Sequence, residues 1–390
     1  MSAATTINDD LFDGGPPLRW QRKLGLVKPT QRQLLRRIEL IALAAWFPMA
    51  VLAIAESMVL NDNTAKAFLT DFACYQRFLV AVPFFILAES DCIPRLGAVA
   101  RQFLASGMIR DQDRARYDNA LASTRRLLDS KAAEVLVVVI AYAIVIAMIN
   151  FVPVGIRSPW QRSESGFMSL SWPAWWLALV SVPLMLVLII GWLWRIILWG
   201  RFLWLMEHLD LLLIPGHPDH VGGLKFISSS LRGFRLLAFA FGNIVAGTVA
   251  NRVRDGASPM AFKQLVIGLI IFILILSVGP LTIFIRKIRS AKRRGMFTYG
   301  ALAASLGLQF EQKWLKQAGS LDRQVLEVPD FSATVDLFGV VSNVYEMKDI
   351  PFGWKNVAPL VVSTLLPFIP VALLVFPLKE ILKDVAKLLI

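Results

Sequence analysis

Residues 264–285 read QLVIGLIIFILILSVGPLTIFI and contain no charged side chain. Folded as a helix at 1.5 Å per residue, this segment is long enough to cross a hydrocarbon core about 30 Å thick. Comparable apolar blocks lie at 38–60, 74–94, 133–153, 173–194, 234–250, 262–285 and 358–377. We therefore predict an all-α fold, a polytopic transmembrane helix bundle of about seven spans with cytoplasmic amphipathic helices.

The composition supports this class of protein. Of the 390 residues, 56% are hydrophobic and 18% are charged, against about 25% charged residues in an ordinary soluble domain. These values exclude a disordered chain and argue against a single soluble globule. The sequence contains no recognisable nucleotide-binding loop, metalloprotease signature or nucleophile elbow, so we expect no cofactor and no catalytic residue, and lean against an enzyme.

The distribution of positive charge predicts the orientation, because cytoplasmic loops retain Lys and Arg. With seven spans, 31 of the 41 Lys and Arg residues fall on one side of the membrane. The N-terminus is therefore predicted to be cytoplasmic and the C-terminus periplasmic. Since the net charge of +13 follows from topology, we do not expect nucleic acid as a partner.

The spans divide the chain into six predicted parts. Residues 1–37 are polar and lack the apolar core of a signal peptide. The parts are a cytoplasmic tail (1–37), a transmembrane hairpin (38–94), cytoplasmic amphipathic helices (95–132), spans three to six with a cytoplasmic loop at 208–225 (133–285), a cytoplasmic helical region (286–357), and the last span with a C-terminal amphipathic segment (358–390). The region after span six is expected to pack beneath the bundle.

A basic cluster follows span six directly. It comprises Arg286, Lys287, Arg289, Lys292, Arg293 and Arg294. Such a cluster favours an anionic leaflet by about 1 kcal/mol per basic side chain near the surface. It predicts contact with the lipid bilayer and with anionic lipid at the cytoplasmic leaflet, and an ordinary positive-inside anchor is preferred over specific recognition of a lipid. A homo-oligomer is also compatible with the sequence.

All three histidines lie close together, at His208, His217 and His220, with Asp219 between the last two. Imidazole and carboxylate groups are common ligands of zinc, manganese and iron, and imidazole can relay protons near neutral pH. The surrounding segment is rich in Pro and Gly, which favours a turn in which Asp219 accepts backbone hydrogen bonds. The structural role is preferred, and proton relay and metal binding stay as alternatives.

The same region carries a resemblance to a known family. The motifs HPDHVGGLKF, YGALAASLGLQFEQKWL, PDFSATVDLFGVVSNVYEMKDIPF and LLPFIPVALLVFPLKEIL resemble a family of bacterial multipass inner-membrane proteins with no assigned activity. The resemblance implies a shared fold and a bacterial inner membrane. His217, Pro218 and Asp219 match its pattern, whereas His208 and His220 fall outside it.

Charged side chains inside the spans are a second pointer to function, because a charge at membrane depth is costly and is normally paired. Glu56 and Arg77 lie at similar depths in spans one and two, so we predict that they form an ion pair. Glu89 and Asp91 are expected to gather at the cytoplasmic end of span two, with Arg95. These groups form either structural pairs or a proton or cation pathway.

Spans four and five carry two further patterns. Trp192, Arg195 and Trp199 continue span four beyond its apolar core and are typical of the membrane interface. In span five, small residues recur every four positions, at Ala238, Gly242, Ala246 and Ala250, which predicts close helix packing. No internal repeat is evident. Cys74 and Cys92 lie too far apart along span two to form a disulfide.

Three functions remain open. The first is a transporter or channel-like protein for a small solute or ion, which a water-accessible cavity reaching Glu56, Arg77 or Glu89 would favour. The second is a membrane scaffold or sensor, which a tightly packed bundle with an apolar cytoplasmic patch would favour. The third is a membrane-embedded metalloenzyme, which requires converging imidazoles.

Overall fold

The computed structural model describes residues 11–16, 31–163, 167–315 and 330–375. These residues form helices, turns and two isolated bridges, without a β-strand. Seven helical stretches in them are long and apolar enough to cross a membrane. The prediction of an all-α bundle with about seven spans is confirmed.

Each predicted span corresponds to one helical stretch, and several stretches are built from consecutive pieces. Span one is α2 (Gln31–Leu60); span two is α4 (Phe72–Tyr75), η1 (Gln76–Ala81) and α5 (Val82–Ala105); span three is α7 (Lys131–Phe151); span four is α8 (Trp172–Trp176), η6 (Leu177–Ser181) and α9 (Val182–Glu207). Span five is η7 (Leu224–Ser229), α10 (Ser230–Gly233) and α11 (Arg235–Arg254); span six is η8 (Pro259–Phe262), α12 (Lys263–Val278), η9 (Gly279–Phe284), α13 (Ile285–Phe310) and η10 (Glu311–Leu315); span seven is α15 (Trp354–Leu365), η12 (Leu366–Phe368) and α16 (Ile369–Val375).

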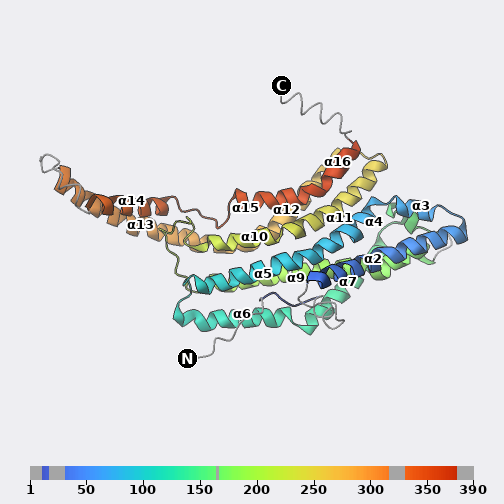
Figure 1. Cartoon of the computed structure of the whole chain (residues 1–390), viewed down its shortest axis with the longest axis horizontal. Helices are drawn as coiled ribbons and strands as arrows, with labels where there is room; N and C mark the ends of the chain where they lie inside the picture. The colour runs from blue at the N-terminus through green and yellow to red at the C-terminus, as the bar shows by residue number, and fades with distance from the viewer. Residues whose placement is uncertain (1–10, 17–30, 164–166, 316–329, 376–390) are drawn as a thin grey trace, which may run out of the picture.

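Shorter elements connect the spans. They are α3 (Thr64–Leu69), η2 (Asp111–Asp113), α6 (Arg114–Leu128), η3 (Val154–Ile156), η4 (Pro159–Gln161), η5 (Phe167–Ser169) and α14 (Asp330–Tyr345). We call the end of the bundle at which α3, η3 and η4 lie the cap end. The opposite end, from which α13 and α14 project, is the arm end (Figure 1).

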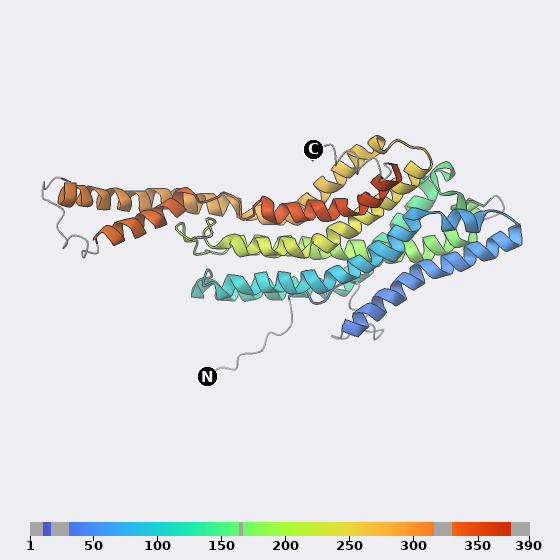
Figure 2. The ribbon, with the colours of Figure 1, turned by 45° about the horizontal axis from the view of Figure 1, so that its top comes forward.

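The arm end is more extended than expected. Helix α13 continues span six, and α14 lies against it, so that together they project beyond the ends of α5 and α6 (Figures 1 and 2). This hairpin, which we call the arm, does not pack beneath the bundle. It meets the bundle at its base, where a side chain at Gly295 would collide with Pro215. Both helices of the arm lie within the region predicted to be helical, 286–357, apart from one residue at the start of α13.

Helix α11 lies at the centre of the bundle, in contact with α4, α5, α15 and α16. The small residues of span five make this possible, as predicted: Ala238 and Ala246 are fully buried. A Cβ at Gly242 would lie 2.4 Å from the Thr364 carbonyl oxygen of α15. The predicted tail is partly packed as well, since Phe12 is buried with its ring edge against Trp199.

Spans two and four repeat one another with an offset of 100 residues. This corrects the expectation that the chain contains no internal repeat. Each begins at an N-cap side chain, Asp71 or Ser171, that accepts a hydrogen bond from the amide three residues later. Each then passes through a π-helical segment and continues after a Val-Pro pair, in the matching sequences FLVAVP (78–83) and ALVSVP (178–183). Proline lacks an amide hydrogen, so the backbone ladder is interrupted at the same point in both spans.

Candidate functional site

A polar cavity of about 390 Å³ opens at the cap end, between η1, the loop that contains η3 and η4, and the last turns of α11. Charged side chains dominate its lining. They are Arg77, Arg157, Arg162, Arg252 and Arg254, against the carboxylates of Asp71 and Asp255. We call this space the arginine cavity. Its lining carries a clear excess of positive charge, which favours anions.

Asp71 holds the walls of this cavity together, and both of its carboxylate oxygens accept hydrogen bonds. Its buried carboxylate accepts hydrogen bonds from the Cys74 amide (3.0 Å), the Trp160 indole (2.6 Å) and the Asn251 side-chain amide (2.7 Å). These three donors come from span two, the cap loop and span five. The carboxylate therefore ties the three walls together, and the described residues include no ion pair between it and an arginine.

Arg77 lies in the π-helical segment η1 and points toward span five. Its Nη2 donates to the Thr248 hydroxyl oxygen at 3.0 Å, and its buried Nε has no hydrogen-bond partner. The predicted ion pair with Glu56 is wrong. The buried Glu56 carboxylate instead accepts the Trp172 backbone amide at 2.7 Å, because α2 packs against α8 here whereas η1 packs against α11.

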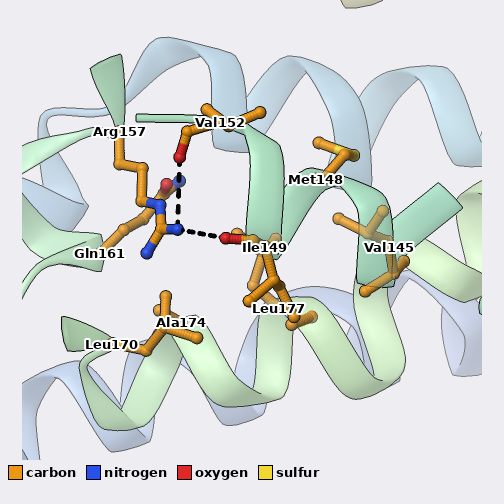
Figure 3. Close-up of a pocket in the computed structure, with 11 residues that line it drawn as sticks. Val145, Met148, Ile149, Val152, Arg157, Gln161, Leu170, Ala174 and Leu177 are labelled. Atoms are coloured by element: carbon orange, nitrogen blue, oxygen red, sulfur yellow. Dashed lines mark hydrogen bonds between the residues drawn. The ribbon is translucent and has the colours of Figure 1, made fainter. Parts of the chain in front are cut away.

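Arg157 lines both the arginine cavity and a second, apolar pocket of about 100 Å³, which Figure 3 shows. Its Nη2 donates to the carbonyl oxygens of Ile149 (2.7 Å) and Val152 (3.3 Å) at the end of α7. Its buried Nη1 has no hydrogen-bond partner. The remaining lining of this pocket is almost entirely aliphatic: Val145, Met148, Ile149, Val152, Leu170, Ala174, Leu177, Ala178 and Val182, with Gln161.

Each of the two spaces lies beside the π-helical segment of one repeated span. Arg77 of η1 lines the arginine cavity, and Leu177 and Ala178 of η6 line the apolar pocket. π-Helical turns are rare, and they occur frequently at functional sites. The repeated spans therefore bring two irregular segments to the same region of the cap end, on either side of Arg157.

A second charged group is buried between spans one, two and four. The carboxylate of Glu89 lies 2.7 Å from Arg37 Nη1 and 3.2 Å from Arg195 Nη1, and all three side chains are at most 5% exposed. Arg195 also donates to the carbonyl oxygen of Gly14. The cluster carries one more positive than negative charge. Asp91 is separate from it and forms the expected pair with Arg95, at 2.8 Å.

The positions of Arg37 and Arg195 differ from those that the sequence predicts. The sequence predicts Arg37 in the N-terminal tail, and it predicts Arg195, with Trp192 and Trp199, at the membrane interface. The structure buries Arg195 and both tryptophans completely, and the Trp192 indole donates to the Phe85 carbonyl oxygen at 2.9 Å. The reason is that span four crosses span two at this level, so its aromatic residues face protein and not lipid headgroups.

The His-Pro-Asp loop is a capped turn. Asp219 accepts hydrogen bonds from the backbone amides of Val221 (2.9 Å), Gly223 (3.0 Å) and Lys225 (3.1 Å). Burial by itself raises the pKa of Asp219, but these amides and nearby His217 outweigh burial and hold the pKa below its usual value. His217 lies 2.9 Å from the same carboxylate. This matches the structural role expected for Asp219.

The other two histidines are directed elsewhere. His208 is half exposed and lies against the ring of Trp204. His220 adopts a positive φ of 57° and its carbonyl oxygen accepts the Lys348 amide at the base of the arm. The described residues include no group of three or more His, Cys, Asp or Glu side chains placed to hold a metal ion.

The basic cluster after span six divides into two groups. Arg286, Arg289, Arg293 and Arg294 are exposed, and Arg289 pairs with Asp349 at 3.2 Å. Lys287 donates to the carbonyl oxygens of Glu207 and Leu209, and Lys292 donates to that of Met347. The two lysines, predicted to face lipid, thus attach the start of α13 to neighbouring loops. Cys74 and Cys92 are free and buried.

Comparison with protein-family models, curated proteins and solved structures gives no match. The class of the protein therefore follows from its own fold. Seven long apolar helices, many of whose large aliphatic and aromatic side chains are exposed on the outside of the bundle, define an integral, multipass membrane protein with apolar surfaces suited to lipid.

Proposed function

We propose that this protein is a transporter or channel-like protein for a small solute or ion. The observation that supports this function best is the arginine cavity, which reaches Arg77 inside span two. A cavity that enters the helical bundle beside irregular backbone is typical of substrate sites in membrane transporters. A cavity that reaches Arg77 is expected of a transporter and is not expected of a tightly packed scaffold.

Two further features support transport. The parallel repeat of spans two and four resembles the internal repeats on which many transporters are built. The buried cluster of Arg37, Glu89 and Arg195 places net charge between three spans. Ionisable groups within a membrane bundle commonly mark a pathway.

The test is flux into liposomes that contain the purified full chain. Acetate, phosphate, chloride and potassium are supplied outside, and vesicle volume and internal pH are followed by stopped-flow fluorescence. We expect accelerated entry of at least one of these ions relative to empty liposomes. We also expect Arg77→Gln to slow that entry, because Arg77 lies in the cavity wall.

A matched control is Arg232→Gln. Arg232 is an exposed residue of α10 outside the lining of the arginine cavity, so it removes the same charge without touching that cavity. Equal rates for empty and protein-containing vesicles with all four ions would contradict the proposal. Equal slowing by both variants would contradict the role of the arginine cavity.

A scaffold or sensor is the second candidate, and the arm favours it. Large apolar side chains of the arm are exposed, among them Phe297 (76%), Leu308 (59%) and Val335 (70%). Exposed apolar patches of this kind mark protein interfaces. Phe297→Glu with Val335→Glu would leave flux unchanged and abolish partner binding if the arm serves this role. The metalloenzyme alternative gains no support from the described residues.

We further propose the location and orientation of the protein. The motif resemblance supports a bacterial inner membrane, and the charge distribution supports a cytoplasmic N-terminus and a periplasmic C-terminus. The arm end then faces the cytoplasm, where Arg286, Arg293 and Arg294 meet anionic lipid. The cap end and its arginine cavity face the periplasm.

A further inference from the structure

We infer that the two cap-end spaces together bind a small organic oxyanion with a short apolar tail, its head between Arg77 and Arg157 and its tail in the apolar pocket. This inference deepens the proposed function and rests on it for the role of the site. It names the chemical class of the ligand, which transport alone does not determine. Binding itself is tested without any flux.

The charges select an anion. Five arginines line the arginine cavity, and of its two carboxylates Asp71 is held by three donors whereas Asp255 pairs with Arg254 at 3.1 Å. Arg77, Arg157 and Arg252 form no ion pair with a described carboxylate. Guanidinium groups bind carboxylates and phosphates through paired hydrogen bonds.

The unused donors indicate where the oxyanion binds. Arg77 Nε and Arg157 Nη1 are buried and have no hydrogen-bond partner. A buried donor without a partner costs about 1–3 kcal/mol, more when it is charged, so such donors are normally matched by another group. Both residues line the arginine cavity, so an anion bound there would supply their guanidinium groups with the acceptor that they lack.

The apolar pocket indicates the rest of the ligand. It shares Met148, Val152, Arg157 and Gln161 with the arginine cavity, and in Figure 3 its aliphatic side chains surround the space beside the Arg157 guanidinium. Its volume of about 100 Å³ suits a short alkyl group.

The experiment is calorimetric titration of the full chain, in phosphatidylcholine nanodiscs, with acetate, propionate, butyrate and butylamine. We expect affinity to rise about fourfold per added methylene from acetate to butyrate, as expected for burial of an alkyl chain. Butylamine, with the same tail and the opposite charge, should not bind. Equal affinities for butylamine and butyrate would overturn the inference.

Variants separate the two halves of the site. Arg77→Gln should weaken butyrate at least tenfold, Arg77→Lys should restore part of the loss, and Arg232→Gln should change nothing. Ala178→Leu, which fills the apolar pocket, should remove the chain-length gain and leave acetate binding unchanged. Acetate binding thus also checks that this variant is folded. A chain-length gain that survives Ala178→Leu would contradict the assignment of the tail.

Two controls complete the test. Loss of butyrate binding in nanodiscs containing phosphatidylglycerol would identify a lipid headgroup as the occupant and overturn the soluble ligand. Butyrate binding without flux of butyrate or of any of the four ions would support this inference and contradict transport. Flux of another ion without butyrate binding would support transport and contradict this inference.

Discussion

Glu89 lies where three spans meet, and both of its charged partners are arginines. Two guanidinium groups contact its carboxylate, and the cluster is out of reach of solvent. Burying ions is costly, and the pair interactions return that cost only when the geometry is good. Removing Glu89 therefore leaves two buried cations without a counter-ion, whereas removing all three charges does not.

Glu89→Ala should destabilise the protein by about 3–5 kcal/mol, because it leaves Arg37 and Arg195 buried without a counter-ion. The triple change Arg37→Met, Glu89→Leu, Arg195→Met should recover most of that loss. Thermal unfolding of the purified variants measures both. A triple variant less stable than Glu89→Ala would show that the cluster contributes more than mutual neutralisation.

Asp219→Ala should lower the free energy of unfolding by about 1–2 kcal/mol, because three backbone amides lose their acceptor. His208→Ala should be mild, since His208 is half exposed. The comparison of unfolding temperatures at pH 7 measures both effects. A larger loss for His208→Ala than for Asp219→Ala would contradict the capping role.

The lowered pKa of Asp219 predicts that the stability of the protein depends on pH. The pKa of Asp219 is lower in the folded protein than its usual value near 3.9. Its stabilising contribution is therefore fully present above about pH 4 and is lost as the pH falls through the folded value. The stability difference between the protein and Asp219→Asn should shrink below about pH 4, as followed by unfolding at stepwise lower pH. A constant difference would contradict the lowered pKa.

Among the helices, the matched pair of spans two and four shows how proline and a π-helical turn act together. Pro183 cannot donate to the carbonyl oxygen of Leu179, and the Tyr142 hydroxyl of span three donates to it instead, at 3.0 Å. A neighbouring helix thus satisfies the freed carbonyl, as membrane bundles require. The irregular turn persists and forms a cavity wall.

Helix α11 depends on glycine where it touches α15. Gly242→Ala should destabilise the protein by about 1–3 kcal/mol, because the added Cβ would collide with the Thr364 backbone. Gly268→Ala in α12 is the matched control, since nothing lies within 4 Å of a Cβ there. Unfolding temperatures of the two variants measure the difference. Equal values would show that α15 moves aside at little cost.

In the whole molecule, an odd number of spans places the two termini on opposite sides of the membrane. A reporter fused after Arg294, at the arm end, should report cytoplasm, and one fused at Ile390 should report periplasm. Alkaline phosphatase and fluorescent-protein fusions measure this directly. Both reporters on the same side would remove one span from the membrane.

The membrane class, the seven spans, the close packing of span five and the turn at Asp219 follow from the sequence alone. Each depends on a local property. These properties are the length of an apolar run, the spacing of small residues, and an aspartate in a segment rich in Pro and Gly. These properties act within one segment, so the order of residues is sufficient to predict them.

The charge partners and the cavities were decided only by the tertiary structure. Glu56 and Arg77 match in depth, yet they face different neighbours, and Glu89 pairs with residues 52 positions before it and 106 positions after it. Depth in a span follows from sequence position, whereas the direction of a side chain around the helix axis depends on which helices pack against it. Arg157 lines two cavities for the same reason: the residues around these cavities come from spans two, three, four and five.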